Sequence, residues 1–144
     1  MILCLIYFFK GNMIKKIAHI GIAVKDLQSA KEIYKKLFCS EPSEEEVVEE
    51  QKVRVVKFSV GESTIELLEP TSSDSPIAKF IERRGEGIHH VGYESDDVKQ
   101  ELKRLDEEGF ELINKEPRIG SDNMLIAFIK PQSVVGVLTE ICQH

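Results

Sequence analysis

The chain has 144 residues, of which 42% are hydrophobic and 31% are charged, so one ordinary domain can form a core without disulfides or a structural metal. The formal net charge of −6 argues against nucleic acid as the main partner, because phosphate binding needs a basic surface. It does not exclude a small anionic ligand, since local fields can oppose the net charge. The three cysteines form no CxxC pair, which favours a reducing, cytoplasmic location.

The first twelve residues, MILCLIYFFKGN, form a short apolar run. The run is too short to cross a bilayer and lacks the basic leader and cleavage site of a signal peptide, so we expect no membrane role. Because MIKKIAHIGIAV, starting at Met13, looks like a natural start, we interpret residues 1–12 as an upstream extension. The alternative is a hydrophobic arm that packs on a neighbouring subunit.

Residues 13–70 predict a strand, a helix and a run of further strands. IAHIGIAV is typical of a strand, and Asp26 can cap a helix in which apolar residues recur at helical spacing from Leu27 to Leu37. The segment KVRVVKFSVGESTIELLEP then predicts a hairpin. Together these segments predict a βαβββ module.

Residues 71–86 predict a linker with a short helix, capped by Asp74 or Ser75 and with Pro76 in its first turn. Residues 87–144 then repeat the first pattern, with Asp96 or Asp97 as the cap of a second helix. The predicted fold is therefore α+β, with two tandem βαβββ modules that form a curved mixed sheet.

The two modules align residue by residue, as expected of an internal repeat. The aligned pairs are His19 with His90, Gly21 with Gly92, Asp26 with Asp97, Phe58 with Phe128, and Glu66 with Glu140.

The repeated histidines and glutamates predict a divalent metal site. Each histidine shares a strand face with the glycine two residues later, which we expect to leave room for a ligand. Glu66 and Glu140 lie in apolar strands, where a carboxylate is costly unless it is paired, hydrogen-bonded or bound to a metal. Two imidazoles and two carboxylates suit Zn, Co, Ni, Mn or Fe(II). His89 has no repeat partner and is expected to face away, in a structural or supporting role.

At these residues the chain resembles the vicinal oxygen chelate (glyoxalase I-like) superfamily and, within it, the methylmalonyl-CoA epimerase family. The similar stretches include HIGIAVKDLQSAKEIYKKLF, DSPIAKFIERRGEGIHH, NKEPRIG and GVLTEICQ, and the similarity covers residues 14–143. The second of these stretches is the most specific, because a general match to the fold would not require it.

The resemblance implies a divalent metal held by His19, His90 and Glu140, with Glu66 at the fourth position of the family. It also implies interconversion of the (2R) and (2S) forms of an acyl-CoA thioester, methylmalonyl-CoA, through a metal-stabilised enolate, in a homodimer. Proton removal on one face and return on the other needs two carboxylates, for which Glu66 and Glu140 are the candidates. We favour Glu66 as the base, because a Glu140 bound to metal would be less free.

The chain departs from the family pattern in places that leave the substrate open. Some members carry glutamine where Glu66 stands and glutamate near Val55. In the loop KPQSVVGVL, Lys130 replaces a histidine of the family. Weaker substrate contacts are predicted at Gln51, on a possible flap, and at Lys130, Ser133 and Arg118.

Two other functions are kept as alternatives. A glyoxalase I-type lyase (lactoylglutathione lyase) would use the same four ligands on a thiol hemithioacetal. A non-catalytic small-molecule-binding protein of this fold would lack a ligand or have an aromatic-lined cleft, whereas this chain fills all four positions and has no Trp.

Overall fold

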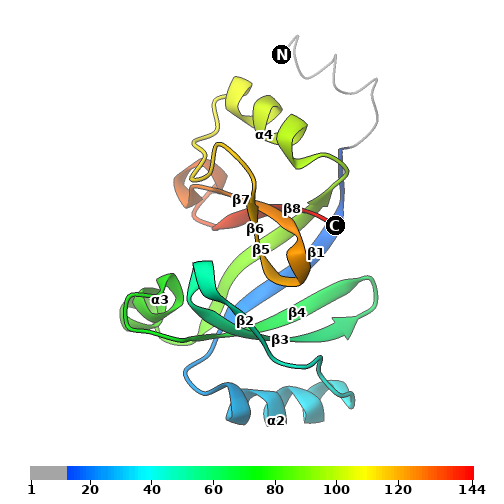
Figure 1. Cartoon of the computed structure of the whole chain (residues 1–144), viewed down its shortest axis with the longest axis vertical. Helices are drawn as coiled ribbons and strands as arrows, with labels where there is room; N and C mark the ends of the chain where they lie inside the picture. Colours follow the sequence, from blue (N-terminus) through cyan, green and yellow to red (C-terminus); the bar gives the residue numbers. More distant parts are fainter. Residues whose placement is uncertain (1–12) are drawn as a thin grey trace.

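The computed structural model describes residues 13–144, so the interpretation of residues 1–12 lies outside the described residues. In the first module β1 (Ile14–Ala23) is followed by α2 (Leu27–Phe38), β2 (Glu46–Val48), β3 (Val53–Val60) and β4 (Ser63–Pro70). After α3 (Pro76–Arg84), the second module has β5 (Gly87–Ser95), α4 (Val98–Glu107), β6 (Arg118–Ile119), β7 (Leu125–Ile129) and β8 (Thr139–Gln143). Short 3-10 turns occur at η1 (Glu49–Gln51), η2 (Ser121–Asn123) and η3 (Pro131–Val134). The order confirms the predicted α+β fold of two βαβββ modules (Figure 1).

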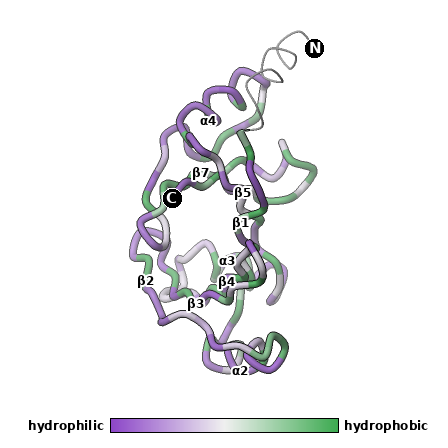
Figure 2. The backbone as a smooth tube through the Cα atoms, turned by 90° about the vertical axis from the view of Figure 1, so that its right-hand side faces the viewer, coloured by the Kyte–Doolittle hydropathy of each residue, from purple (hydrophilic) through white to green (hydrophobic). Residues whose placement is uncertain are grey.

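All eight described strands belong to one curved mixed sheet, in the order β2-β3-β4-β1-β5-β8-β7-β6. The modules join at its centre, where β1 runs antiparallel to β5. Each of these two strands has a parallel partner from its own module, β4 beside β1 and β8 beside β5. Helices α2 and α4 lie at opposite ends of the molecule, as expected for a pseudo-twofold repeat (Figures 1 and 2). No described helix is long and apolar enough to cross a bilayer.

The helix caps resolve the choices that the sequence left open. Asp26 caps α2 as predicted, by accepting a hydrogen bond from the amide of Ser29. The second module uses Asp97, whose carboxylate accepts from the amide of Gln100, and α3 uses the buried Ser75. Each side chain satisfies an amide that the first helical turn leaves without a partner.

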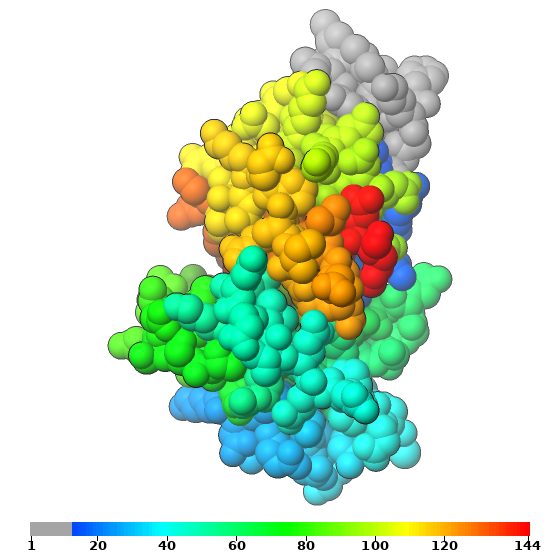
Figure 3. All heavy atoms as spheres, in the orientation of Figure 1, coloured from blue at the N-terminus to red at the C-terminus, as the bar shows by residue number. Residues whose placement is uncertain are grey.

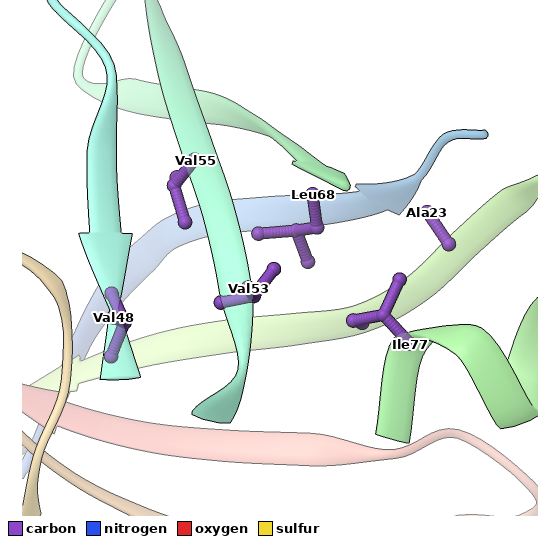
Figure 4. Packing of buried hydrophobic residues seen from close by; sticks show 6 residues of the cluster. All are labelled: Ala23, Val48, Val53, Val55, Leu68 and Ile77. Atoms are coloured by element: carbon purple, nitrogen blue, oxygen red, sulfur yellow. The ribbon is translucent and has the colours of Figure 1, made fainter. Parts of the chain in front are cut away.

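Separate apolar clusters hold the helices on the sheet. Leu27 and Ala30 of α2 pack on Phe58 and Leu67, and Val98 and its neighbours in α4 pack on the second module. A third cluster lies between α3 and the first module. Its side chains come from the strands β1, β2, β3 and β4 and from α3 (Figure 4). Its buried members are Ala23, Val48, Val53, Val55, Leu68 and Ile77. The cluster places a rigid apolar wall beside the centre of the sheet.

One predicted repeat pair is wrong by one residue. In the strand register, Glu66 lies opposite Lys57, whereas Glu140 lies opposite Phe128. Lys57, and not Phe58, is therefore the counterpart of Phe128. Phe58 points to the other face of the sheet and is buried beneath α2. The sequence alignment was drawn to the identical aromatic residue, although side chains alternate along a strand and the two phenylalanines face opposite ways.

Candidate metal centre

At the centre of the sheet, the side chain of each histidine lies over the strand that carries the other: His19 of β1 lies over β5, and His90 of β5 lies over β1. In the antiparallel pair of β1 and β5, His19 lies opposite Gly92 and His90 lies opposite Gly21. A Cβ atom at Gly21 would stand 2.3 Å from Cε1 of His90, and one at Gly92 would stand 2.3 Å from Cε1 of His19. The expectation that the glycines leave room for a ligand was therefore wrong. Each glycine makes room for the histidine of the other module.

The crossing brings three predicted ligands together in the interior. The Nε2 atoms of His19 and His90 are 3.1 Å apart, and Glu140 Oε1 lies 3.0 Å from Nε2 of His19. Glu140 Oε2 lies 3.6 Å from Nε2 of His90. All three residues are buried, and their candidate ligand atoms lie within 4.8 Å of one another. Both modules thus contribute to one compact cluster of nitrogen and oxygen donors.

The cluster fits a divalent cation. Glu140 Oε1 lies 3.0 Å from Nε2 of His19, yet it is one of two buried side-chain nitrogen or oxygen atoms in the described part of the chain that have no hydrogen bond of suitable geometry. A buried carboxylate oxygen that lacks a well-aligned donor is costly, and a cation beside it would reduce that cost. Two imidazole nitrogens and a carboxylate oxygen are ligands that Zn, Co, Ni and Mn accept. His19, His90 and Glu140 would therefore hold the metal.

Glu66 lies next to this cluster but outside it. Its Oε2 is 3.9 Å from Nε2 of His19, and the side chain is buried on the same face of the sheet. Burial raises the pKa of Glu66 and the nearby charge of Glu140 adds to this, while the charges of His19 and Lys57 act against it. Glu66 is thus a buried carboxylate next to His19, His90 and Glu140, but it does not belong to their cluster of candidate ligand atoms. Its role as a fourth ligand stays a prediction.

Without metal, the two histidines have opposite electrostatic states. Burial lowers the pKa of His19, but the side chains of Cys142 and Glu140 and the charge of Glu66 outweigh burial and raise it to about 11. Burial, together with the positive charge of His19, lowers the pKa of His90 well below its usual value. One charged and one neutral imidazole therefore share the pair of carboxylates.

The sequence predicted that His89 faces away from the site, and this was wrong. Its Nδ1 lies 3.0 Å from Nδ1 of His90, and its ring packs edge-on against Phe80 of α3. Burial lowers the pKa of His89 to about 4, so its ring is neutral near pH 7. The contact leaves Nε2 of His90, which faces His19, as the nitrogen directed at the cluster. His89 therefore supports the orientation of His90.

An apolar cavity of about 210 Å³ opens beside the cluster, with His90 in its wall. Val53, Leu68 and Ile77 of the third apolar cluster form part of this wall (Figure 4). Gln51 borders both this cavity and the smaller one that contains Glu66 and Glu140. Of the predicted substrate contacts, Gln51 thus lies where a ligand could reach it, beside the metal cluster.

Lys130 and Ser133 lie elsewhere, on the loop between β7 and β8. Nζ of Lys130 is 3.2 Å from the carboxylate of Glu111, and the Ser133 hydroxyl accepts a hydrogen bond from the Glu111 amide. Neither residue lines the two cavities beside the cluster. The structure thus shows a local structural use for both, and their part in substrate binding stays a prediction.

Ser121 is a site residue that the sequence reasoning missed. It is 8% exposed and borders the small cavity together with Glu66, His90 and Glu140. It belongs to η2, between β6 and β7, and its counterpart in the first module is η1, between β2 and β3. The two turns have different sequences, EEQ and SDN, so the repeat gave no signal for Ser121. Arg118, in the short strand before this turn, borders the large cavity.

The fold and the cluster agree with the family comparison. Residues 18–128 match the glyoxalase/bleomycin resistance protein/dioxygenase superfamily. The chain belongs to this superfamily.

Relatives at higher similarity come from several organisms. An uncharacterised protein of Bacillus subtilis, YqjC, is 38% identical over 128 residues, covering 89% of this chain and 91% of that protein. The mitochondrial methylmalonyl-CoA epimerase of Bos taurus is 34% identical and covers 89% of this chain and 74% of its own. A variant of the Streptomyces coelicolor methylmalonyl-CoA epimerase, solved with 2-nitronate-propionyl-CoA, superposes with a TM-score of 0.85 at 35% identity, covering 90% of this chain and 94% of that one.

Proposed function

We propose that this protein is a methylmalonyl-CoA epimerase, which interconverts the (2R) and (2S) forms of its acyl-CoA substrate. The observation that carries the proposal is the buried cluster of His19, His90 and Glu140, with the carboxylate of Glu66 beside it. The similarity to epimerases from cattle and Streptomyces coelicolor supports the substrate class. A structure of a methylmalonyl-CoA epimerase with methylmalonyl-CoA, 36% identical and with a TM-score of 0.84, supports it further.

The residues of the chain divide the work by position. A divalent cation such as Co, Mn, Ni or Zn would stabilise the negative charge that develops on the substrate oxygens when the C2 proton leaves. His19, His90 and Glu140 would hold that cation, and the antiparallel pairing of β1 with β5 keeps the two imidazoles in place. The apolar cavity beside His90 offers space for an apolar part of the substrate next to these residues.

Proton transfer is assigned to the carboxylates. Glu66 is the preferred base, because it lies beside the donor cluster but outside it and is buried. Burial also raises its pKa, which makes the carboxylate a stronger base than an exposed one. Glu140 is the candidate acid or base for the opposite face, in addition to its role as a ligand. Gln51 and Ser121 supply polar groups at the small cavity.

The test is exchange of the C2 proton of methylmalonyl-CoA in heavy water, followed by NMR with protein loaded with Co²⁺. We expect metal-dependent exchange in the wild type and a loss of about 10²–10⁴-fold in Glu66→Gln, the range for removal of a general base. Glu62→Gln is the matched control, because Glu62 is exposed in the turn before β4 and should leave the rate unchanged.

A second assay separates the alternative lyase. The same four residues suit proton transfer in a glutathione hemithioacetal, so methylglyoxal with glutathione is assayed in parallel. Metal-loaded protein that turns over the hemithioacetal but leaves methylmalonyl-CoA unexchanged would overturn the epimerase proposal in favour of a glyoxalase I-type lyase.

We also infer a homodimer from the resemblance to the superfamily, and a cytoplasmic location from the cysteines, which form no CxxC pair. In support, α2 exposes Ile33 and Leu37, which are 63% and 67% exposed in the single chain. Light scattering after size-exclusion chromatography tests the inference, and a mass equal to one chain would contradict it.

A further inference from the structure

The two edges of the curved sheet are linked by polar side chains. β2 and β6 are the edge strands, at opposite ends of the strand order. The amide of Asp122, just after β6, nevertheless donates to the carboxylate of Glu46 in β2 at 3.1 Å. Nη2 of Arg118 in β6 also lies 3.4 Å from Glu50, just after β2. Figure 3 shows the two segments side by side, residues near 46–50 in teal and residues near 118–123 in orange.

Lys57 extends this link into the candidate active site. Its Nζ lies 2.5 Å from Oδ2 of Asp122 and 3.7 Å from Oε1 of Glu66. The Lys57 side chain is 15% exposed, whereas that of Asp122 is 60% exposed. One ammonium group from the first module therefore contacts both the η2 turn of the second module and the preferred base.

The η2 turn is where the second module reaches the small cavity. Asp122 and Asn123 adopt left-handed backbone conformations, with φ values of 52° and 56°. The turn places the buried Ser121 in the wall that also contains Glu66 and Glu140. Any movement of Asp122 would therefore move Ser121 relative to Glu66.

The strand register indicates that the fold itself does not require a lysine here. In the second module the position equivalent to Lys57 is occupied by Phe128, whose ring packs on His90 at a centroid distance of 5.7 Å. An ammonium group that is mostly withdrawn from water costs free energy that a neutral side chain would not. The contacts of Lys57 with Asp122 and Glu66 offset this cost.

We propose that Lys57 is a positioning residue, which ties the η2 turn to Glu66 and so holds Ser121 and Glu66 in fixed relation across the small cavity. We call the set of Lys57, Asp122 and Glu46 the edge latch. This inference rests on the proposed epimerase function for its effect on catalysis. The effect of the edge latch on the η2 turn is independent of the substrate.

The first measurement is hydrogen–deuterium exchange of a peptide spanning residues 118–126, on metal-loaded full-length protein without substrate. Lys57→Met and Asp122→Asn should both accelerate exchange in this peptide, because each removes one partner of the ion pair. Asparagine tolerates the left-handed conformation at position 122, so Asp122→Asn changes the charge without a new backbone strain. Lys15→Met is the matched control, since Lys15 forms an exposed ion pair with Asp96, outside the edge latch.

The second measurement is the C2 proton exchange rate of the same variants at varied methylmalonyl-CoA concentration. For Lys57→Met we expect a fall in kcat of about tenfold or more, because displacement of a reacting group by a fraction of an ångström is costly. KM should change by less than about twofold, since a positioning residue acts on the reacting groups and not on substrate binding. Lys57→Arg, which keeps the charge, should recover most of the rate. The double variant Lys57→Met, Asp122→Asn should be about as slow as Lys57→Met alone, because both substitutions break the same ion pair.

The outcomes separate the inference from the proposed function. If wild-type protein shows no C2 exchange, the epimerase proposal fails, and the exchange of residues 118–126 still decides whether the edge latch holds the turn. If Lys57→Met and Asp122→Asn leave that peptide as protected as in Lys15→Met, the edge latch is overturned. A wild-type kcat in Lys57→Met would overturn the positioning role.

Discussion

At the scale of single residues, Gly21 and Gly92 leave the least room for a side chain among the glycines in residues 13–144. Alanine at Gly21 would place a Cβ atom 2.3 Å from the ring of His90, a distance that real Cβ contacts do not show. We expect Gly21→Ala to displace this ligand and to lower Co²⁺ affinity by about tenfold or more, in the range seen when the partners of metal ligands are removed. Isothermal titration calorimetry measures the change.

The control for this substitution lies on β3, away from the donor cluster. Ser59 is exposed, so Ser59→Ala should leave Co²⁺ affinity as in the wild type. Gly92→Ala should resemble Gly21→Ala, because its Cβ atom would stand 2.3 Å from the ring of His19. Wild-type affinity in both glycine variants would contradict the tight crossing of the histidines.

His19 makes metal binding depend on pH. Its pKa is raised to about 11 despite burial, by Cys142, Glu140 and Glu66, so the ring carries a proton at pH 7 in the metal-free protein. A metal must displace this proton, and we expect release of about one proton on Co²⁺ binding and an affinity that rises with pH. Calorimetry in buffers of different ionisation enthalpy counts the protons, and a count of zero would contradict the raised pKa.

The raised pKa of His19 also makes the stability of the metal-free fold depend on pH. Because the pKa of His19 in the folded protein lies above its unfolded value, its charge stabilises the fold fully below the unfolded pKa, near 6.5. This contribution is lost as the pH rises toward about 11. Bound metal should remove this dependence, because a ligand nitrogen no longer binds the proton.

At the scale of elements, the cap of α4 offers a test of local stability. Asp97→Ala removes the acceptor for the amide of Gln100 and should lower the free energy of unfolding by about 1 kcal/mol. For a chain of this length we expect a fall in Tm of about 3 °C, measured by circular dichroism.

The neighbouring Asp96 is the matched control for the cap. Its side chain is 72% exposed and pairs with Lys15, and exposed pairs contribute little. Asp96→Ala should therefore change Tm by less than Asp97→Ala. A larger effect at Asp96 would mean that the cap lies one residue earlier.

Elements with strong local signals were predictable from the sequence. Asp26, Ser75 and Asp97 precede helical patterns, and the sequence narrowed each cap to one or two residues. The pairing of Lys57 with Glu66 was not predictable, because strand register depends on contacts between strands and the identical Phe58 and Phe128 misled the alignment. The η2 turn shares no residues with its counterpart η1 and has no strong pattern of its own, so Ser121 was missed.

The candidate site was predictable in membership but not in arrangement. The internal repeat predicted four residues, His19, Glu66, His90 and Glu140. In the structure the candidate ligand atoms of His19, His90 and Glu140 lie within 4.8 Å of one another, and Glu66 lies beside them. The crossing of histidines over glycines follows from the register of β1 with β5, which no single strand encodes. The local contacts of Lys130 and Ser133 with Glu111 likewise depend on how the β7–β8 loop folds back.

At the scale of the whole molecule, metal should bind the two modules together. The donors come from β1 of the first module and from β5 and β8 of the second, so unfolding of either module destroys the site. A cation at about a thousand times its Kd would stabilise the fold by about 4 kcal/mol. We therefore expect Co²⁺ to raise the Tm of chelator-treated protein by about 10 °C, measured by calorimetry.

Two histidine variants control this experiment. His19→Ala should abolish the rise in Tm, because it removes one donor. His144→Ala should keep the rise, since that side chain is 65% exposed and pairs with Glu94. An equal rise in all three proteins would place the stabilising metal elsewhere.

The exchange of histidines across the central strands also limits how the two halves of the chain can change over time. A larger residue at Gly21 would displace the ring of His90, and a larger residue at Gly92 would displace the ring of His19. Substitutions at these four positions are therefore coupled in pairs, each pair spanning both modules. Elsewhere the two halves differ even at equivalent strand positions, as Lys57 in β3 and Phe128 in β7 illustrate, whereas a substitution at the histidine crossing needs a matching change in the other module.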